Sequence, residues 1–218
     1  MKLHLGCGER YLPGYINIDY PASEHTVQQS RVCDQEADLL SLQYAAESVE
    51  EVRLHHVFEH FTRPVACALL TSWYSWMPAA GILHIEVPDF GAAARRALGL
   101  FTSEQGRCVA ERHIFGSQEA HWAVHCIGYT EARLRGLLEA FGFIPQKVNK
   151  SEWRGTDNLE IVAQRSAGQL TFADFEQRTK DYLSLFLVDD SESEKRLLEV
   201  WINLWREQAL RGWALGND

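Results

Sequence analysis

Two short apolar segments at the start of the chain, joined by a glycine turn, most constrain what this sequence can fold into. Residues 3–5 predict a strand that opens into Gly6-Cys7-Gly8, and residues 15–20 predict a second strand that carries Asp19. In open α/β sheets such a turn lets the backbone approach a ligand closely, and an acid ending the second strand accepts hydrogen bonds from ribose hydroxyls. The opening therefore predicts a nucleoside site at the carboxyl ends of parallel strands.

The pattern continues as alternating strands and helices. Further strands are expected at residues 31–38, 51–57, 82–87, 143–148 and 159–164. Apolar residues recur at helical spacing after Thr62, over residues 92–101 and after Thr130. This order predicts a doubly wound α/β fold with a mostly parallel, seven-stranded sheet. Only residues 6–14 join the first two strands, so we expect that crossover to hold a single helical turn or none.

The last part of the chain reads as purely helical. Residues 166–169 form a junction, and two apolar stripes follow at helical spacing, over residues 172–187 and 197–205. We therefore expect residues 1–165 to form one domain and residues 166–218 a helical extension. Because amphipathic helices must bury their apolar stripes, the extension is expected to pack on its own domain or in a homodimer.

Composition narrows the class of protein. The 218 residues are 46% apolar and carry a net charge of −9, which argues against an electrostatic nucleic-acid binder. No apolar run reaches the length of about 18 residues that a membrane helix needs. The five cysteines include no Cys-x-x-Cys pair, so neither a disulfide framework nor a structural zinc site is expected. These features favour a cytoplasmic protein that acts on a small molecule.

Four segments, in the correct order, resemble class I S-adenosylmethionine-dependent methyltransferases, and more narrowly a bacterial subgroup of methyltransferase type 11-like proteins. The segments are Leu-Gly-Cys-Gly with Leu-Pro-Gly-Tyr-Ile-Asn-Ile-Asp up to residue 19, His-His-Val-Phe-Glu-His at 55–60, the stretch 77–89 that ends in Val-Pro-Asp, and Tyr-Thr-Glu at 129–131 leading to Gly-Phe at 142–143. The resemblance covers residues 2–165. The sequence departs from the family's pattern at Arg10, where the loop usually has a third glycine.

The resemblance implies S-adenosylmethionine as the cofactor and places its contacts residue by residue. The implied cofactor-binding residues are Gly6, Cys7, Gly8, Asp19, Asp38, Leu39, His56 and Val57. Of these, Asp19 would hold the ribose hydroxyls, and Asp38 with the Leu39 backbone would hold the adenine. The glycines and His56-Val57 would lie at the methionine end of the cofactor.

The catalytic candidates are histidines and one carboxylate. They are His60, Glu59, His121 and His125. His60 follows the fourth strand on the ligand face, and its near-neutral pKa suits a base that takes a proton from a hydroxyl or amine. An equally weighted interpretation is that Glu59 and His60 only tie the loop by hydrogen bonds.

His121 and His125 are four residues apart and would share a face if helical. That spacing permits a metal pair, but no zinc-protease carboxylate motif accompanies it, so we expect no metal. A substrate-lining role is favoured over a metal role, and surface or packing roles are as common as both together. Segments 102–129 and 151–158 are expected to form the acceptor's walls. Asp89 is expected to cap the helix that follows it rather than to act in the site.

The resemblance implies transfer of a methyl group from S-adenosylmethionine to a small-molecule acceptor, with oxygen as the expected atom and a histidine assisting deprotonation. One alternative is a non-catalytic S-adenosylmethionine-binding protein that regulates or scaffolds. A less favoured alternative is a dinucleotide-dependent oxidoreductase, because the loop lacks the Gly-x-Gly-x-x-Gly spacing.

Overall fold

The computed structural model describes residues 1–24, 27, 30 and 32–214. The strands are β1 (Lys2–Leu5), β2 (Ile16–Asp19), β3 (Gln35–Glu36), β4 (Glu51–His55), β5 (Ile82–Pro88), β6 (Phe143–Trp153) and β7 (Thr156–Arg165). The helices are α1 (Arg63–Trp76), α2 (Phe90–Ala97), α3 (Glu104–Phe115), α4 (Glu131–Ala140), α5 (Phe172–Ser184) and α6 (Glu192–Gly212), with the single turns η1 (Ala22–Glu24), η2 (Leu39–Ser41) and η3 (Phe58–His60). Residue 31 of the expected third strand and residues 215–218 of the tail lie outside the described residues.

The seven strands form one sheet in the order β3-β2-β1-β4-β5-β7-β6. Strand β7 is antiparallel to both of its neighbours, and the other pairs are parallel. The predicted seven-stranded, mostly parallel sheet is confirmed. The crossover from β1 to β2 holds no helix, because the Gly6 and Cys7 amides turn back at once and donate to the Ile18 carbonyl at 2.8 and 3.1 Å.

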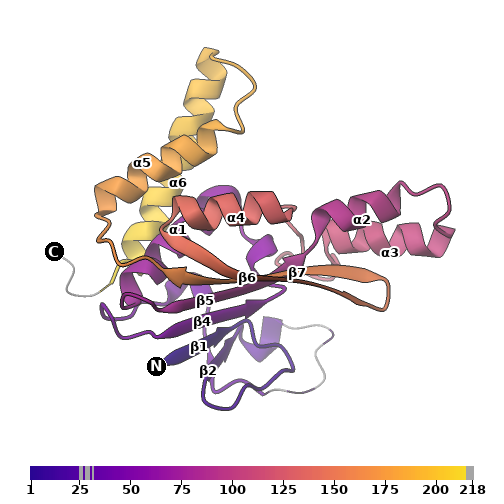
Figure 1. Cartoon of the computed structure of the whole chain (residues 1–218), viewed down its shortest axis with the longest axis horizontal. Coiled ribbons are helices and arrows are strands. Elements are labelled where there is room, and N and C mark those ends of the chain that lie inside the picture. Colours follow the sequence, from indigo (N-terminus) through magenta and orange to yellow (C-terminus); the bar gives the residue numbers. More distant parts are fainter. Residues whose placement is uncertain (25–26, 28–29, 31, 215–218) are drawn as a thin grey trace.

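Residues alternate between an apolar and a polar face along the central strands. Leu3, Val52 and Ile85 are fully buried in the core cluster with residues of α1, α4, α5 and α6. Figure 1 shows α4, α5 and α6 on one side of the sheet. The intervening residues His4, Arg53 and His84 point to the opposite face, since successive strand side chains alternate.

The C-terminal helix α6 packs against α1 of the same chain. The Trp205 side chain is fully buried, and its indole N–H donates to Thr71 Oγ1 at 3.3 Å. The Trp76 indole N–H in turn donates to the Gly212 carbonyl at 2.6 Å. Helix α6 therefore buries one stripe against α1, while the domain boundary at residue 165 stays a prediction. No helix in the described part of the chain combines the length and apolarity needed to cross a bilayer.

Two segments differ from the elements expected from sequence. Residues 151–158, expected as a loop, form the end of the β6–β7 hairpin, which turns at Arg154 and Gly155 with φ of +50° and +85°. The sequence predicts no element over residues 102–129, but this segment contains α3. The helix begins at Ser103, whose hydroxyl accepts a hydrogen bond from the Gly106 amide. Asp89 caps α2 as expected, since its Oδ1 accepts from the Ala92 amide at 3.0 Å.

Candidate active site

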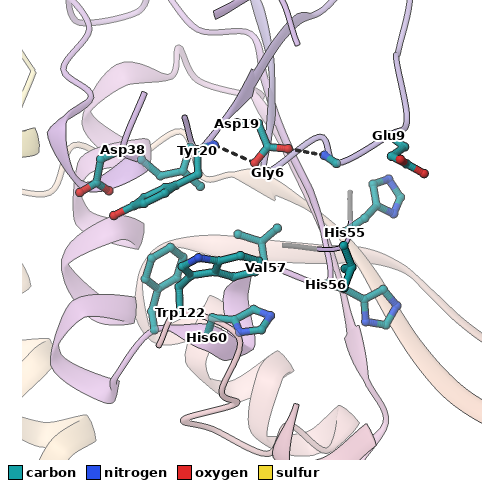
Figure 2. Close-up of a pocket in the computed structure, with 14 residues that line it drawn as sticks. Gly6, Glu9, Asp19, Tyr20, Asp38, His55, His56, Val57, His60 and Trp122 are labelled. Atoms are coloured by element: carbon teal, nitrogen blue, oxygen red, sulfur yellow. Dashed lines mark hydrogen bonds between the residues drawn. The ribbon is translucent and has the colours of Figure 1, made fainter. Parts of the chain in front are cut away.

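A cavity of about 440 Å³ lies at the carboxyl ends of β1, β2 and β4. Figure 2 shows its walls. Seven of the eight residues that the resemblance assigned to the cofactor line it, namely Gly6, Gly8, Asp19, Asp38, Leu39, His56 and Val57. The eighth, Cys7, is buried instead, and burial raises the pKa of its thiol to about 12. The Cys7 thiol is therefore neutral at physiological pH and unsuited to act as a nucleophile.

The turn after β1 is held in place by two contacts. Gly6 has φ of +66°, and a Cβ added there would lie 2.3 Å from Val57 Cγ2. The Asp19 carboxylate accepts hydrogen bonds from the Gly8 amide at 2.6 Å and the Tyr20 amide at 2.7 Å. These two backbone amides hold the Asp19 carboxylate at the wall of the cavity.

Asp38 and Leu39, which lie after β3, form another part of the wall of the first cavity. Asp38 Oδ1 accepts from the Leu40 amide at 2.9 Å and so caps η2. Sequence reasoning missed five further residues that line the cavity, which are Glu9, Tyr20, Val27, His55 and Phe61. Glu9, Tyr20 and Phe61 directly follow predicted site residues and His55 directly precedes one, whereas Val27 has no such neighbour. Trp122, which follows His121 in the sequence, lines it as well. The Trp122 indole N–H donates to the Glu24 carbonyl at 3.0 Å and ties its loop to η1.

A second cavity of about 490 Å³ adjoins the first. His56, His60 and Trp122 line both cavities. The remaining walls of the second cavity come from Val109, Arg112, His113, Gly116, Ser117, Ala123, His125, Trp153, Arg154 and Thr156. These residues belong to α3, the loop after it and the turn of the β6–β7 hairpin, within the two segments expected to form the acceptor's walls.

Glu59, His60 and His125 gather at the boundary between the cavities. The Glu59 carbonyl accepts hydrogen bonds from the Cys126 amide at 2.8 Å and the Ile127 amide at 3.2 Å. These bonds bring the loop after α3 against η3 and place the His125 ring 4.7 Å from the His60 ring, centroid to centroid. The Glu59 backbone thus ties the loop, as one sequence-based interpretation expects. His60 lines both cavities, so its role as a base stays a prediction.

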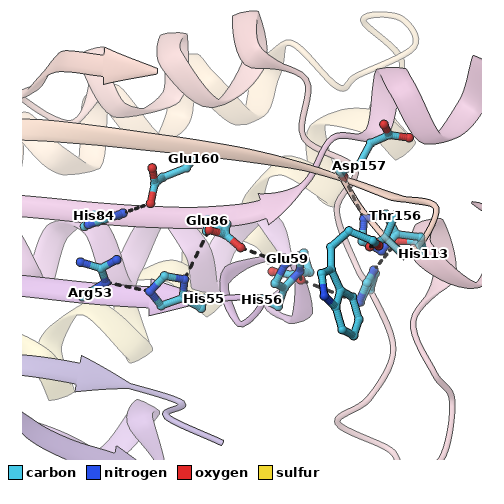
Figure 3. A network of polar contacts seen from close by, with 12 residues as sticks. Arg53, His55, His56, Glu59, His84, Glu86, His113, Thr156, Asp157 and Glu160 are labelled. Atoms are coloured by element: carbon cyan, nitrogen blue, oxygen red, sulfur yellow. Dashed lines mark hydrogen bonds and ion pairs between the residues drawn. The ribbon is translucent and has the colours of Figure 1, made fainter. Parts of the chain in front are cut away.

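His56 lies between two carboxylates (Figure 3). Its Nδ1 is 3.4 Å from Glu59 Oε1, and its Nε2 is 3.3 Å from Glu86 Oε1. Burial opposes protonation of the imidazole, but the two carboxylates outweigh it and raise the pKa of His56 to about 9. His55 and His56 together hold the pKa of Glu86 well below its usual range. His56 is therefore a cation at neutral pH.

Burial lowers the pKa values of His113 and His125, so both are neutral. His113 Nε2 contacts the Asp157 carbonyl at 2.9 Å, and His125 Nδ1 contacts the His113 carbonyl at 3.1 Å. His121, by contrast, is exposed in a turn and lines neither cavity. Residues 120–124 are not helical, so His121 and His125 do not share a helix face.

Comparisons with known proteins agree on the fold. No protein-family model matches this sequence, and no curated protein matches it. Among solved structures, an S-adenosylmethionine-dependent methyltransferase from Methanosarcina mazei matches with a TM-score of 0.51 and 16% identity, over 77% of this chain and 92% of that one. A complex from Haloferax volcanii, between the Trm112 methyltransferase activator and a protein described as a methyltransferase, matches with a TM-score of 0.53 and 12% identity, over 78% of this chain and 83% of that one. The class I methyltransferase fold implied by the sequence resemblance is confirmed.

Proposed function

We propose that this chain, which has the class I methyltransferase fold, binds S-adenosylmethionine in the first cavity and transfers its methyl group to a small molecule in the second. The observation that carries the proposal is the shared boundary, since His56, His60 and Trp122 line both cavities. A cofactor with its methionine end against Gly6 and Val57 would present its methyl group there. Holding the two reactants in line is the main contribution that a protein makes to such a transfer.

The first cavity supplies groups suited to each part of the cofactor. Asp19 is placed to accept from the ribose hydroxyls, and Asp38 with the Leu39 backbone is placed to hold the adenine. The cavity volume lies in the range of about 300–1,000 Å³ that is usual for small-molecule sites. The cofactor itself supplies an electrophilic methyl group, so the protein has to orient it and to manage one proton.

We assign proton removal to His60, with oxygen as the acceptor atom. Its Nδ1 lies 3.2 Å from the Val124 carbonyl oxygen, which can only accept a hydrogen bond. Nδ1 therefore carries the hydrogen, and Nε2 has a lone pair that can take the proton of an acceptor hydroxyl. With S-adenosylmethionine bound, the methyl group would pass from its sulfur to this oxygen, and Nε2 of His60 would take the hydroxyl proton. Glu59 supports the imidazolium by its negative charge.

The second cavity favours a flat acceptor that carries negative charge. Arg112 and Arg154 are on its wall, and no carboxylate is among its described lining residues. The Arg154 guanidinium lies over the Trp153 ring, 4.6 Å from the ring centroid. Trp122 and Trp153 offer flat apolar surfaces on which an aromatic acceptor can stack.

We also propose a homodimer through the C-terminal helices. Leu185, Val200 and Leu204 of the extension are exposed by 78%, 54% and 47%. Large apolar side chains that stay exposed after the two helices have packed favour association with a second copy. Light scattering of the full chain at two concentrations measures this, and Leu185→Glu with Leu204→Glu would give a monomer.

The experiment that tests the catalytic proposal is a transfer assay with methyl-labelled S-adenosylmethionine. The full chain is incubated with aromatic hydroxy acids and with their neutral analogues, and S-adenosylhomocysteine release is measured. Release that depends on the acceptor, and is faster with the acids, is the expected result. Tight cofactor binding without release for any acceptor would instead support the regulatory alternative.

A further inference from the structure

We propose that Glu59, His60 and His125 bind one divalent transition-metal ion, such as Zn²⁺ or Mn²⁺, at the boundary between the two cavities. Among the described residues, one ligand atom from each of the three lies within 4.8 Å of the other two. Two imidazoles and one carboxylate are a donor set that such ions accept, and the set leaves coordination positions free.

The Glu59 side chain supplies the first argument. The residue is 1% exposed, and no donor among the described residues makes a hydrogen bond to either of its carboxylate oxygens. The nearest histidine nitrogens are His56 Nδ1, 3.4 Å from Oε1, and His125 Nε2, 3.8 Å from the same oxygen. A buried carboxylate that makes no close hydrogen bond is unfavourable, because the contacts with His56 and His125 at 3.4 and 3.8 Å replace only part of the water that it has lost. A bound cation would supply the missing interaction.

The orientation of the two imidazoles supplies the second argument. Nδ1 of His60 faces the Val124 carbonyl, and Nδ1 of His125 faces the His113 carbonyl. Carbonyl oxygens only accept, so both Nδ1 atoms carry hydrogen, and both Nε2 atoms are left with lone pairs. Histidines that bind metals characteristically donate their other ring N–H to a carbonyl or carboxylate, which fixes the tautomer.

The distance between His125 and Glu59 fits an ion between them. His125 Nε2 lies 3.8 Å from Glu59 Oε1, beyond hydrogen-bond distance. Two ligands that each lie about 2.1 Å from one ion are at most about 4.2 Å apart. The partly exposed His60 ring would complete the set by turning slightly inward. His56 is not offered as a ligand, because Glu59 and Glu86 face its two ring nitrogens.

This site deepens the proposed function, and its catalytic role rests on that function. The free positions of the ion would face the second cavity, where an acceptor hydroxyl could coordinate. Coordination lowers the pKa of a bound hydroxyl and stabilises the oxygen anion that attacks the methyl carbon. In the metal-loaded protein the ion takes this task from His60, and the released proton passes to water.

Metal binding is measured directly on the full chain. The protein is treated with chelator, dialysed and titrated calorimetrically with ZnCl₂ and separately with MnCl₂, and bound metal is quantified by elemental analysis. We expect one equivalent per chain, with affinity at least about tenfold weaker in His60→Ala and in His125→Ala. His121→Ala removes an exposed histidine from the same loop and should bind as the wild type does.

Two results would overturn the metal site. One is the absence of stoichiometric binding by the wild type, and the other is equal affinity in His60→Ala, His125→Ala and wild type. Binding of S-adenosylhomocysteine to the same chelated protein separates this inference from the proposed function. Cofactor binding without metal binding overturns only the site, whereas metal binding without cofactor binding overturns only the proposed function.

Discussion

Gly6 lies directly against Val57, so that a Cβ added at Gly6 would be 2.3 Å from Val57 Cγ2. The contact joins the turn after β1 to the segment after β4, and both residues line the first cavity. Real Cβ atoms do not approach a neighbour so closely, so a side chain at position 6 requires the Val57 side chain or one of the two segments to shift. The shape of the cofactor cavity therefore depends on the absence of a side chain here.

Gly6→Ala should weaken binding of S-adenosylhomocysteine at least about tenfold, because a shift at Gly6 or Val57 moves residues that would contact the ligand. Calorimetric titration measures this. Gly14→Ala is the matched control, because Gly14 has φ of +85°, is exposed and has open space where a Cβ would lie. Both variants carry a backbone cost of about 1–2 kcal/mol. Equal affinities in the two variants would show that the Gly6–Val57 contact does not shape the site.

The C-terminal extension should contribute strongly to stability. Trp205→Ala empties a fully buried position between α6 and α1 and should lower the free energy of unfolding by about 3–5 kcal/mol. Urea denaturation measures the change. Trp153→Ala makes the same substitution at a side chain that is 62% exposed, and it should cost less than about 1 kcal/mol. Similar losses in both variants would contradict the packing described for α6.

Stability should fall as the solution becomes acidic. His4 is 1% exposed, faces Asn17, Arg53 and His55, and burial lowers its pKa. Below the ordinary histidine pKa of about 6.5, His4 binds a proton in the unfolded chain but stays neutral in the native protein. The free energy of unfolding therefore decreases as pH falls through that value. Urea denaturation at pH 8 and pH 5.5 should show a smaller decrease for His4→Gln than for wild type. A residual slope is expected, because burial also lowers the pKa values of His84, His113 and His125, while the raised pKa of His56 acts in the opposite direction. Identical slopes would exclude this contribution of His4.

His60→Ala should separate catalysis from cofactor binding. Loss of a positioned proton acceptor or metal ligand should reduce kcat about 10²–10⁴-fold. The affinity for S-adenosylhomocysteine should change little, since Asp19, Asp38 and the β1 turn remain. The variant is compared with wild type by acceptor-dependent turnover and by calorimetry. Unchanged turnover with a true acceptor would remove His60 from the mechanism.

The sequence predicted the cofactor side of the molecule better than the acceptor side, for a physical reason. Gly6, Gly8 and Asp19 lie within fourteen residues, so a local motif contains both halves of their interaction. The central strands alternate apolar and polar residues, which is a signal readable in any short window. Helix α3 carries no strong apolar stripe, and its local signals are confined to the Ser103 cap at its start and to Gly116, with φ of +88°, at its end.

The acceptor side depends on contacts between distant segments. His125 meets Glu59 because two amides 67 and 68 residues further along the chain donate to the Glu59 carbonyl. Arg154 reaches the second cavity because β6 and β7 form a long hairpin with its turn at that residue. The spacing of His121 and His125 pointed instead to a pair on a helix, and that helix does not form. The cluster of Glu59, His60 and His125 depends on long-range contacts, so no local pattern could have identified it.

Calorimetric titration of the wild type and Asp19→Asn with S-adenosylhomocysteine, and separately with NAD, tests the central claim most directly. The substitution keeps the size of the side chain and removes the charge that strengthens its hydrogen bonds to ribose hydroxyls. We predict micromolar binding of S-adenosylhomocysteine to the wild type, at least about tenfold weaker binding to Asp19→Asn, and no binding of NAD. No binding of S-adenosylhomocysteine, or equal binding to both proteins, would contradict the account.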